Sequence, residues 1–435
     1  MKQFLKDILS SVTVVIIATL IGLILLYLVH LLPVSPMQDN IARSSELYNY
    51  EGVYPQWDTG YKATQLDNWT ETLVLAAAIY DGGDHSLTER VFYVPYMEYD
   101  DLSMPLSLTN YANHSALTNC HETDYDRYWH GSIVLLKPLL LFFDMPDIRM
   151  ICMLLTFFLL IWTVIRMKND HMDLYIPAFL FGMAVYMPVT TGLSTKFTAE
   201  TVTMQVLSLL ILKNGDEAGK RNWVVPFALT GCLTSFLGEL SFPIVSLGFP
   251  LLFLAWQRSE KLNAKRFFTY SAAWGIGYFL NWILKWLLGT LLTERDFIQD
   301  NIRHFLSYHE DKVGYDLFGN ELVWEPGFFM RSLKNLLVVT KWPFILLFLG
   351  ITAYYICVFV KRGYAITRES AKETLVPLLI GCLPFLLYFA LGNGYSYVHY
   401  WMSYRQLSVT AAAAFGALIC LGSGGSPSTE PPQRP

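Results

Sequence analysis

Apolar runs of roughly 17 to 25 residues recur along this 435-residue chain, and they constrain its fold more than any other feature. A helix of that length crosses the hydrocarbon core of a bilayer, which is about 30 Å thick. Apolar residues make up 53% of the chain and charged residues only 15%, a composition that excludes an ordinary soluble protein. The sequence therefore predicts an all-α polytopic membrane protein.

About ten transmembrane helices are predicted from the positions of these runs. By residue number they are 9–33, 148–165, 174–193, 198–213, 223–240, 242–256, 267–292, 338–360, 374–391 and 406–422. Basic residues gather near the N-terminus and after the second, fourth, sixth and eighth of these helices. Because cytoplasmic loops are rich in Lys and Arg, we expect both termini in the cytoplasm.

The chain divides into four regions on this reading. They are a first transmembrane helix at 1–33, a long extracytoplasmic loop at 34–147, a multi-helix transmembrane domain at 148–422 and a disordered tail at 423–435. The segment 293–337 also faces outward and could cap the same cavity as the long loop. The loop is expected to carry two interfacial helices, one from Asp67 to Tyr80 and a second from Ser132 to Phe143 that is broken at Pro138.

The first candidate site in the loop is the segment 66–71. Asp67 and Glu71 are four residues apart, so their carboxylates share one face of a helix. Such a carboxylate could act as a general base on an acceptor hydroxyl. The alternative is that Asp67 or Asn68 caps the helix and Glu71 adds a favourable charge in the first turn, with Asp58 as an ordinary loop acid.

The second candidate site is the segment 125–131, in which Arg127 and His130 lie among aromatic residues. An arginine and a histidine together could bind a phosphate or pyrophosphate. The alternative is an anchor at the membrane interface, where Tyr and Trp are common.

Charged residues inside or beside the predicted spans are a third signal, because a charge in lipid is costly. They are Lys196, Glu239, Lys285, His399 and Arg405. In the predicted topology all of them fall toward the outer side, and together they indicate an amphipathic cavity suited to a lipid with a phosphorylated head. Snorkelling to the headgroups is the alternative for Lys196 and Arg405, but not for Glu239.

Other function classes find no support in the sequence. No phosphate-binding glycine loop, zinc-protease motif or serine elbow is present, and nothing indicates binding to nucleic acid. Five of the six cysteines, all but Cys120, lie in apolar runs, so neither a disulfide framework nor a metal site is predicted.

The arrangement resembles the GT-C superfamily of membrane glycosyltransferases. The resemblance covers the topology and four segments: 66–71, 127–131, 239–243 and 399–405. These segments look similar to segments of uncharacterised bacterial membrane proteins associated with the superfamily, so the resemblance implies a bacterial cytoplasmic membrane. It implies transfer of a sugar from a polyprenyl-phosphate-linked donor to a cell-surface glycan or lipid acceptor on the outer face of the membrane. The chain departs from better-known members in lacking an adjacent acidic pair early in the loop and a large soluble C-terminal domain.

The resemblance also implies roles for individual residues. The base, or a metal-holding carboxylate, would be Asp67, with Asp58 as the other candidate and Glu71 as a possible helper. Arg405, Lys196 or Arg127 would lie near the carrier phosphate, with Glu239 and His399 in the same site, and His130 would add a proton-transfer or phosphate contact. A divalent metal is compatible with the superfamily but is not required, because cationic side chains could suffice.

Two other functions compete with this one. A transporter or flippase of lipid-linked saccharides would share the outer cavity, but it usually shows internal repeats and charges on both sides of the midplane. An assembly or scaffold protein would tolerate changes of the loop charges without consequence.

Overall fold

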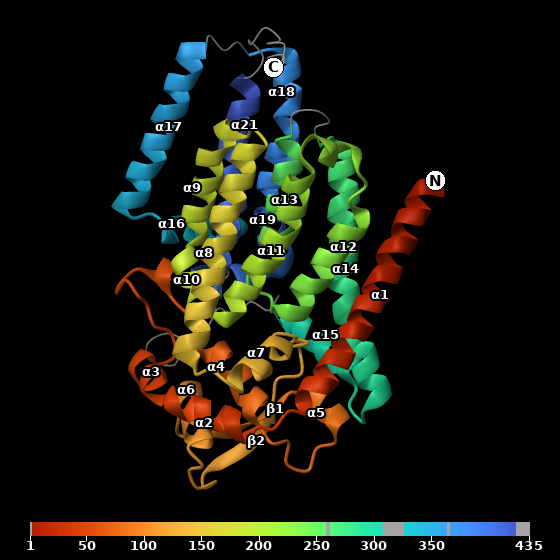
Figure 1. Cartoon of the computed structure of the whole chain (residues 1–435), viewed down its shortest axis with the longest axis vertical. Coiled ribbons are helices and arrows are strands. Elements are labelled where there is room, and N and C mark those ends of the chain that lie inside the picture. Colours follow the sequence, from red (N-terminus) through yellow and green to blue (C-terminus); the bar gives the residue numbers. More distant parts are fainter. Residues whose placement is uncertain (1, 258–261, 308–325, 363–365, 423–435) are drawn as a thin grey trace.

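The computed structural model describes residues 2–257, 262–307, 326–362 and 366–422, and it is built almost entirely of helices. Figure 1 shows a bundle of long helices standing on a layer that is formed by the segment between α1 and α8. The expectation of an all-α membrane protein is therefore confirmed. The predicted tail at 423–435 and residues 308–325 of the predicted second outer segment lie outside the described residues.

The bundle contains helices of very different lengths. They are α1 (Lys2–His30), α8 (Met145–Asn169), α9 (Ile176–Tyr186), α10 (Pro188–Gly192), α11 (Thr195–Asn214), α12 (Val224–Leu237), α13 (Ile244–Ala255), α14 (Ala264–Leu292), α15 (Phe297–Ser307), α16 (Phe328–Val338), α17 (Trp342–Arg362), α18 (Arg368–Glu373), α19 (Leu375–Asn393), α20 (Tyr400–Ser403) and α21 (Leu407–Gly422). Short 3₁₀ or π turns join several of them, at 173–175, 215–220, 394–398 and 404–406.

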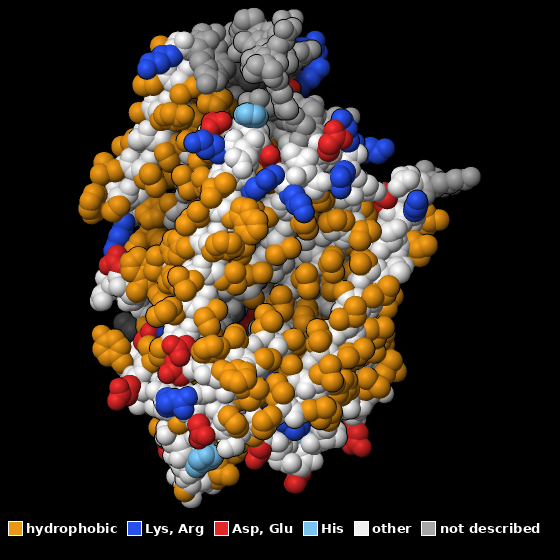
Figure 2. All heavy atoms as spheres, in the orientation of Figure 1, with side chains coloured by type: hydrophobic (Ala, Val, Ile, Leu, Met, Phe, Trp, Pro, Cys, Tyr) orange, Lys and Arg blue, Asp and Glu red, His pale blue; other side chains and the backbone are white. Residues whose placement is uncertain are grey.

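Within the described residues, six helical stretches are long and apolar enough to cross a membrane. They are Leu5–His30, Met145–Asn169, Ala264–Leu292, Trp342–Lys361, Ser370–Gly392 and Tyr400–Gly422. In the space-filling view, exposed apolar side chains cover the middle of the bundle and charged side chains gather toward its two ends (Figure 2). An apolar surface band of this kind is expected of a membrane-embedded protein.

The remaining four predicted spans are helical too. The span at 198–213 lies within the uninterrupted helix α11, which is 20 residues long, and the other three are shorter or interrupted. The predicted span at 174–193 is broken at Met187, whose φ of 61° ends α9 and starts α10. The apolar helices Asp173–Tyr186, Val224–Leu237 and Ile244–Ala255 are each shorter than a full span. Periodicity alone does not reveal such breaks, because the broken helix remains apolar on both sides.

The layer at the base of the bundle consists of short elements. They are α2 (Ser35–Arg43), α3 (Ser45–Glu51), a 3₁₀ turn (Lys62–Thr64), α4 (Asn68–Ile79), α5 (Leu87–Tyr93), β1 (Pro95–Tyr99), α6 (Met104–Ala112), β2 (Cys120–Asp124) and α7 (Ile133–Leu140). The two strands pair antiparallel, with Pro95 opposite Asp124 and Tyr99 opposite Cys120.

Helix α4 begins where the sequence predicts, but it is not an exposed interfacial helix. Asp67 is its N-cap and accepts a hydrogen bond from the Thr70 backbone N–H. Every residue of α4 except Trp69 is buried, because α6, α7 and β1 pack around it. The apolar body of α4 is thus the core of the layer, and the prediction that it lies in the membrane interface is wrong.

Helix α7 supports the other end of α4. The buried Lys137 of α7 donates a hydrogen bond of 2.6 Å to the Ala78 carbonyl in the last turn of α4, where a cation complements the helix dipole. The helix runs through Pro138, so the predicted break is absent. The missing proline N–H costs one backbone hydrogen bond, which a short packed helix tolerates.

Helices α12 and α14 approach each other most closely in the bundle, and two glycines allow it. A Cβ atom at Gly231 of α12 would collide with the Trp274 backbone, and one at Gly277 of α14 would collide with the Ala228 backbone. Small residues at such crossings let helix backbones come together in membrane proteins.

We expect Gly277→Ala to destabilise the protein by about 1–3 kcal/mol, because the added methyl group forces α12 and α14 apart. Gly275→Ala is the matched control, since a Cβ atom there meets nothing within 4 Å. Thermal unfolding of the purified variants in detergent measures both effects. Equal unfolding temperatures for the two variants would contradict this account of the crossing.

A second prediction concerns Lys137. Burial, and then the nearby Arg90 charge, lowers the pKa of Lys137 from 10.5 to about 7. The unfolded chain therefore binds this proton more tightly than the folded chain. Burial of protonated Lys137 lowers the free energy of unfolding by its full amount below pH 7, and this destabilisation fades as the pH rises toward 10.5. Relative to Lys137→Met, the wild type should gain about 1 kcal/mol of unfolding free energy per pH unit between pH 7 and pH 9. Parallel stability profiles for the two proteins would exclude this titration.

Candidate functional site

A cavity of about 400 Å³ lies where the layer meets the bundle. Its volume is in the range of ligand pockets. Its walls come from the layer, from α11, from the connection between α12 and α13, and from the segment before α21. The lining residues are Tyr54, Asp67, Trp69, Thr70, Tyr125, Arg127, Tyr128, Lys196, Glu239, Leu240, Tyr395, His399, Trp401 and Met402.

Asp67 presents a carboxylate in the wall of this cavity. Its Oδ2 accepts hydrogen bonds from the Thr70 hydroxyl, at 2.7 Å, and from the Lys196 ammonium, at 3.1 Å. Its Oδ1 accepts only the longer bond of 3.3 Å from the Thr70 N–H. The oxygen Oδ1 therefore keeps hydrogen-bonding capacity for a ligand.

Lys196 joins two carboxylates that are far apart in the sequence. The residue lies in the first turn of α11, which Ser194 caps, and it is 8% exposed. Its Nζ is 3.1 Å from Asp67 Oδ2 and 2.9 Å from Glu239 Oε2. An ammonium group has three N–H donors, so one remains beyond these two contacts.

His130 lies on the other side of Glu239. Its Nδ1 is 3.4 Å from Glu239 Oε1, and its Nε2 is 2.9 Å from the Tyr125 carbonyl oxygen. Burial lowers the pKa of His130, while the Glu239 carboxylate acts in the opposite direction. Two acceptors thus face the two ring nitrogens, and a protonated imidazole could donate to both.

Helix α14 holds the segment that carries Arg127 and His130. The Trp129 indole N–H donates to the Asn281 carbonyl at 2.9 Å, and the buried Lys285 ammonium donates to the Tyr128 carbonyl. The backbone of His130 has a φ of 49°, a conformation that residues other than glycine rarely adopt. This strained residue is kept in place by its surroundings.

Aromatic rings form much of the remaining wall. The Tyr54 and Trp401 rings are 5.5 Å apart, and the Trp69 and Tyr125 rings meet edge to face at 6.3 Å. The Arg127 guanidinium lies 5.4 Å from the centre of the Tyr125 ring. The cavity therefore combines flat apolar surfaces with a cluster of charged side chains. We call this cluster, formed by Asp67, Lys196 and Glu239, the charged floor.

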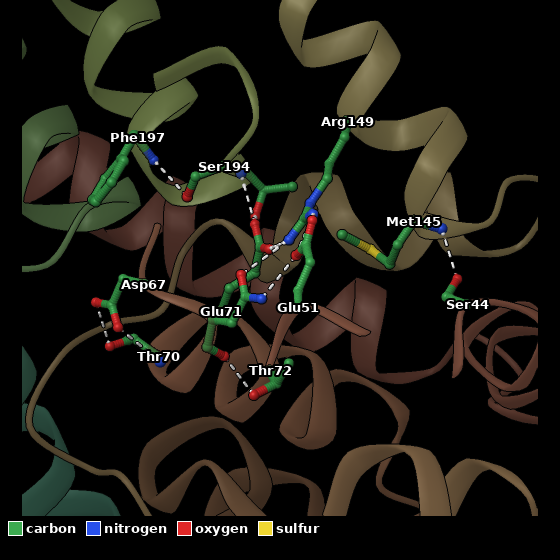
Figure 3. Close-up of polar contacts among 12 residues, drawn as sticks. Ser44, Glu51, Asp67, Thr70, Glu71, Thr72, Met145, Arg149, Ser194 and Phe197 are labelled. Atoms are coloured by element: carbon green, nitrogen blue, oxygen red, sulfur yellow. Dashed lines mark hydrogen bonds and ion pairs between the residues drawn. The ribbon is translucent and has the colours of Figure 1, made fainter. Parts of the chain in front are cut away.

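Glu71 does not share this cavity with Asp67, although the two lie on one helix. Its Oε2 accepts a hydrogen bond of 2.7 Å from Arg149, and its Oε1 accepts two from Thr195, one from the N–H at 2.9 Å and one from the hydroxyl at 3.0 Å. Arg149 also binds Glu51 at 2.8 Å. Figure 3 shows Asp67 turned toward Thr70 and Glu71 turned toward Arg149. Glu71 thus ties α4 to α8 and α11.

Two other candidates also lie outside the cavity lining. Asp58 forms an ion pair of 2.7 Å with Lys341. Arg405 is fully buried, donates to the carbonyls of Trp401, at 3.0 Å, and Ala63, at 3.1 Å, and lies 4.9 Å from the centre of the Phe197 ring. Arg405 thus joins the layer to the segment before α21.

The other charged candidates divide in the same way. His399 lines the cavity, and its Nδ1 is 2.6 Å from the Gly394 carbonyl oxygen. Lys285 instead lies behind the wall, at the Tyr128 carbonyl. The structure therefore brings together Asp67, Arg127, Lys196, Glu239 and His399, with His130 directly behind Glu239.

Glu200 is a buried carboxyl group that the sequence reasoning does not single out. It is 1% exposed, and neither of its side-chain oxygens has a hydrogen-bond partner. It lies one turn after Lys196 on α11, and a Cβ atom at Gly238 would meet its Oε1 at 2.7 Å. Glu200 falls inside the predicted span 198–213. The search for charged residues within predicted spans, which identified Glu239 and Lys285, would therefore also have found Glu200.

The donor set of the cavity does not fit a divalent metal. Asp67 and Glu239 are the two carboxylates at its wall, and the Lys196 ammonium already occupies the position between them. Among the described residues no group of three His, Cys, Asp or Glu side chains could hold a metal ion.

The different surroundings of the two α4 carboxylates predict different costs of neutralisation. Glu71→Gln should destabilise the protein by about 3 kcal/mol, because it leaves the buried Arg149 charge without one of its partners. Asp67→Asn should cost about 1 kcal/mol, because Lys196 keeps Glu239 as a partner. Thermal unfolding compares the two. A larger loss of stability for Asp67→Asn than for Glu71→Gln would contradict the structural role assigned to Glu71.

Comparison with known proteins gives no match to a family model, to a curated protein or to a solved structure. The geometry of the cavity therefore carries the functional argument.

Proposed function

We propose that this chain is a membrane glycosyltransferase that moves a sugar from a polyprenyl-phosphate-linked donor to a hydroxyl group of a glycan or lipid acceptor. One observation carries the proposal. A carboxylate, Asp67, and an ammonium group, Lys196, lie side by side in the wall of an aromatic cavity at the junction of membrane helices and an extramembrane layer. A carboxylate can serve as the base for the acceptor hydroxyl, and a cation can stabilise the departing phosphate.

Asp67 is the proposed general base. Its Oδ1 takes the proton of the acceptor hydroxyl as the hydroxyl oxygen attacks the anomeric carbon of the donor sugar. The bond from that carbon to the phosphate oxygen breaks at the same time, so the configuration inverts. Thr70 fixes the carboxylate through its N–H and its hydroxyl, which favours one orientation of the base.

Lys196 and Arg127 are the proposed partners of the departing phosphate. Both line the cavity, and Lys196 keeps one N–H donor beyond its two carboxylates. Preorganised cations of this kind stabilise charge that develops in the transition state. Glu239 pairs with Lys196 and is contacted in turn by His130, and His399 adds a polar group to the cavity lining.

The aromatic walls suit a sugar ring. Flat rings such as Trp69, Tyr125 and Trp401 offer apolar faces to the C–H groups of a sugar while hydroxyls reach the charged floor. On this proposal ten helical segments, three of them short, cross a bacterial cytoplasmic membrane, both termini are cytoplasmic, and the cavity opens to the outer face. The layer at 34–147 then takes part in acceptor recognition.

The test uses membranes from a strain of the source organism that lacks the gene, because such membranes supply both donor and acceptor. The membranes are solubilised in detergent, purified protein is added, and mass spectrometry follows the loss of sugar from the lipid carrier and its gain by the acceptor. Wild-type protein should restore transfer, and Asp67→Asn should reduce the rate by about 10²- to 10⁴-fold.

Asp58→Asn is the matched control, since Asp58 is a carboxylate of the same layer that pairs with Lys341 outside the cavity lining. It should transfer sugar at close to the wild-type rate. A folded Asp67→Asn variant with full activity would remove Asp67 as the base. A different outcome is that wild-type protein restores the surface glycan in intact cells but gives no sugar transfer in the detergent extract. That result would favour a transporter of lipid-linked saccharides, because transport needs two compartments separated by a membrane and a detergent extract has none.

A further inference from the structure

A second cavity, of about 560 Å³, lies beside α16 and away from the charged floor of the first. We call it the lysine groove. It is lined by Gly60, Tyr61, Lys62, Met330, Leu333, Lys334, Leu337, Val338, Thr340, Lys341, Tyr397 and Tyr400. None of these residues lines the first cavity, so the two hollows are separate.

The polar side of the groove is positively charged. Lys341 forms an ion pair with Asp58 at 2.7 Å. Lys62 instead donates a hydrogen bond of 2.8 Å to the neutral side chain of Gln65. Lys334 donates to the Tyr397 carbonyl at 3.2 Å, and in the described part of the chain no carboxylate pairs with it. Among the described residues, two of the three ammonium groups therefore have no compensating anion.

Lys334 is held in place rather than extended into solvent. Its Nζ lies 3.5 Å from the centre of the Tyr397 ring and 4.1 Å from that of Tyr400. Partial burial lowers the pKa of Lys334. A cation fixed over two aromatic faces is prepared to receive an anion without losing much side-chain freedom.

The other side of the groove is apolar. Helix α16 contributes Met330, Leu333, Leu337 and Val338 to it. The helix is anchored by Asn335, whose amide donates at 2.6 Å to the Ser396 carbonyl. A ligand with both an anionic head and a hydrocarbon part matches this pairing of lysines and apolar side chains.

The groove also lies next to a helix that faces lipid. Helix α17 starts at Trp342, directly after Lys341, and only 6% of its apolar span is buried inside the protein. Figure 1 shows α16 at the end of α17 that is nearer the layer. Lysines, tyrosines and a tryptophan at the end of an exposed span are characteristic of headgroup level.

We propose that the lysine groove binds the phosphate headgroup of an anionic membrane phospholipid, with Lys62 and Lys334 contacting the phosphate and the apolar face of α16 contacting an acyl chain. The apolar face favours a lipid over free phosphate. The site goes beyond the sugar transfer proposed above and does not depend on it.

The test measures lipid binding to the purified full-length chain by native mass spectrometry. Delipidated protein in detergent is titrated with phosphatidylglycerol or with the net-neutral phosphatidylcholine. Wild-type protein should bind phosphatidylglycerol more tightly, and the double variant Lys62→Gln/Lys334→Gln should weaken that binding by about tenfold or more. Phosphatidylcholine binding should not change.

Two controls make the result specific. The double variant Lys168→Gln/Lys265→Gln removes two exposed lysines near the opposite end of the bundle and should bind like wild type. Lys334→Arg keeps the charge and should retain most of the binding. Matching unfolding temperatures show that the variants are folded.

Three outcomes would overturn the proposal. The first is unchanged phosphatidylglycerol binding by Lys62→Gln/Lys334→Gln. The second is equal affinity of wild-type protein for the two phospholipids. The third is displacement of phosphatidylglycerol by millimolar inorganic phosphate, or preference for a polyprenyl phosphate, either of which would give the groove a different occupant.

Discussion

The cost of burying a charge without a partner is the constraint on which this structure depends. Lys196 lies in the interior of the protein, and it is tolerated there because Asp67 and Glu239 contact it from two sides. Those contacts join α4 of the layer, the first turn of α11 and the connection between α12 and α13. The contacts that form the charged floor of the cavity therefore also help to attach the layer to the bundle.

The two carboxylates of α4 show how one helix separates chemistry from architecture. Asp67, at the N-cap, keeps an oxygen with spare hydrogen-bonding capacity at a cavity wall. Glu71, one turn later, uses both oxygens on Arg149 and Thr195. A helix that is buried on nearly all sides holds the N-cap residue rigidly, and the Glu71 contacts fix its orientation about the helix axis. The proposed base is positioned by a neighbour that takes no part in the reaction.

Local signals in the sequence were sufficient for some of these features and not for others. The N-cap at Asp67 and the helical stretches follow from residue type and apolar periodicity. The ion-pair partner of each charged residue does not follow from local signals. Lys196 and Asp67 are 129 positions apart, and only the packing of α11 on the layer brings them together. The sequence offered Arg405 as a phosphate ligand, yet that side chain binds backbone carbonyls. Burial of α4 likewise depends on neighbours that a local pattern does not contain.

The short segment between α19 and α21 separates the two hollows. Tyr395 and Trp401 face the cavity, while Tyr397 and Tyr400 face the lysine groove. Helix α16 is bonded to this partition through Asn335. Since residues of this segment line both spaces, an occupant of one that shifts the partition would alter the affinity of the other, and thermodynamic linkage makes that effect equal in both directions. If both proposed sites are occupied, this partition would couple the composition of the surrounding bilayer to substrate affinity without any moving domain.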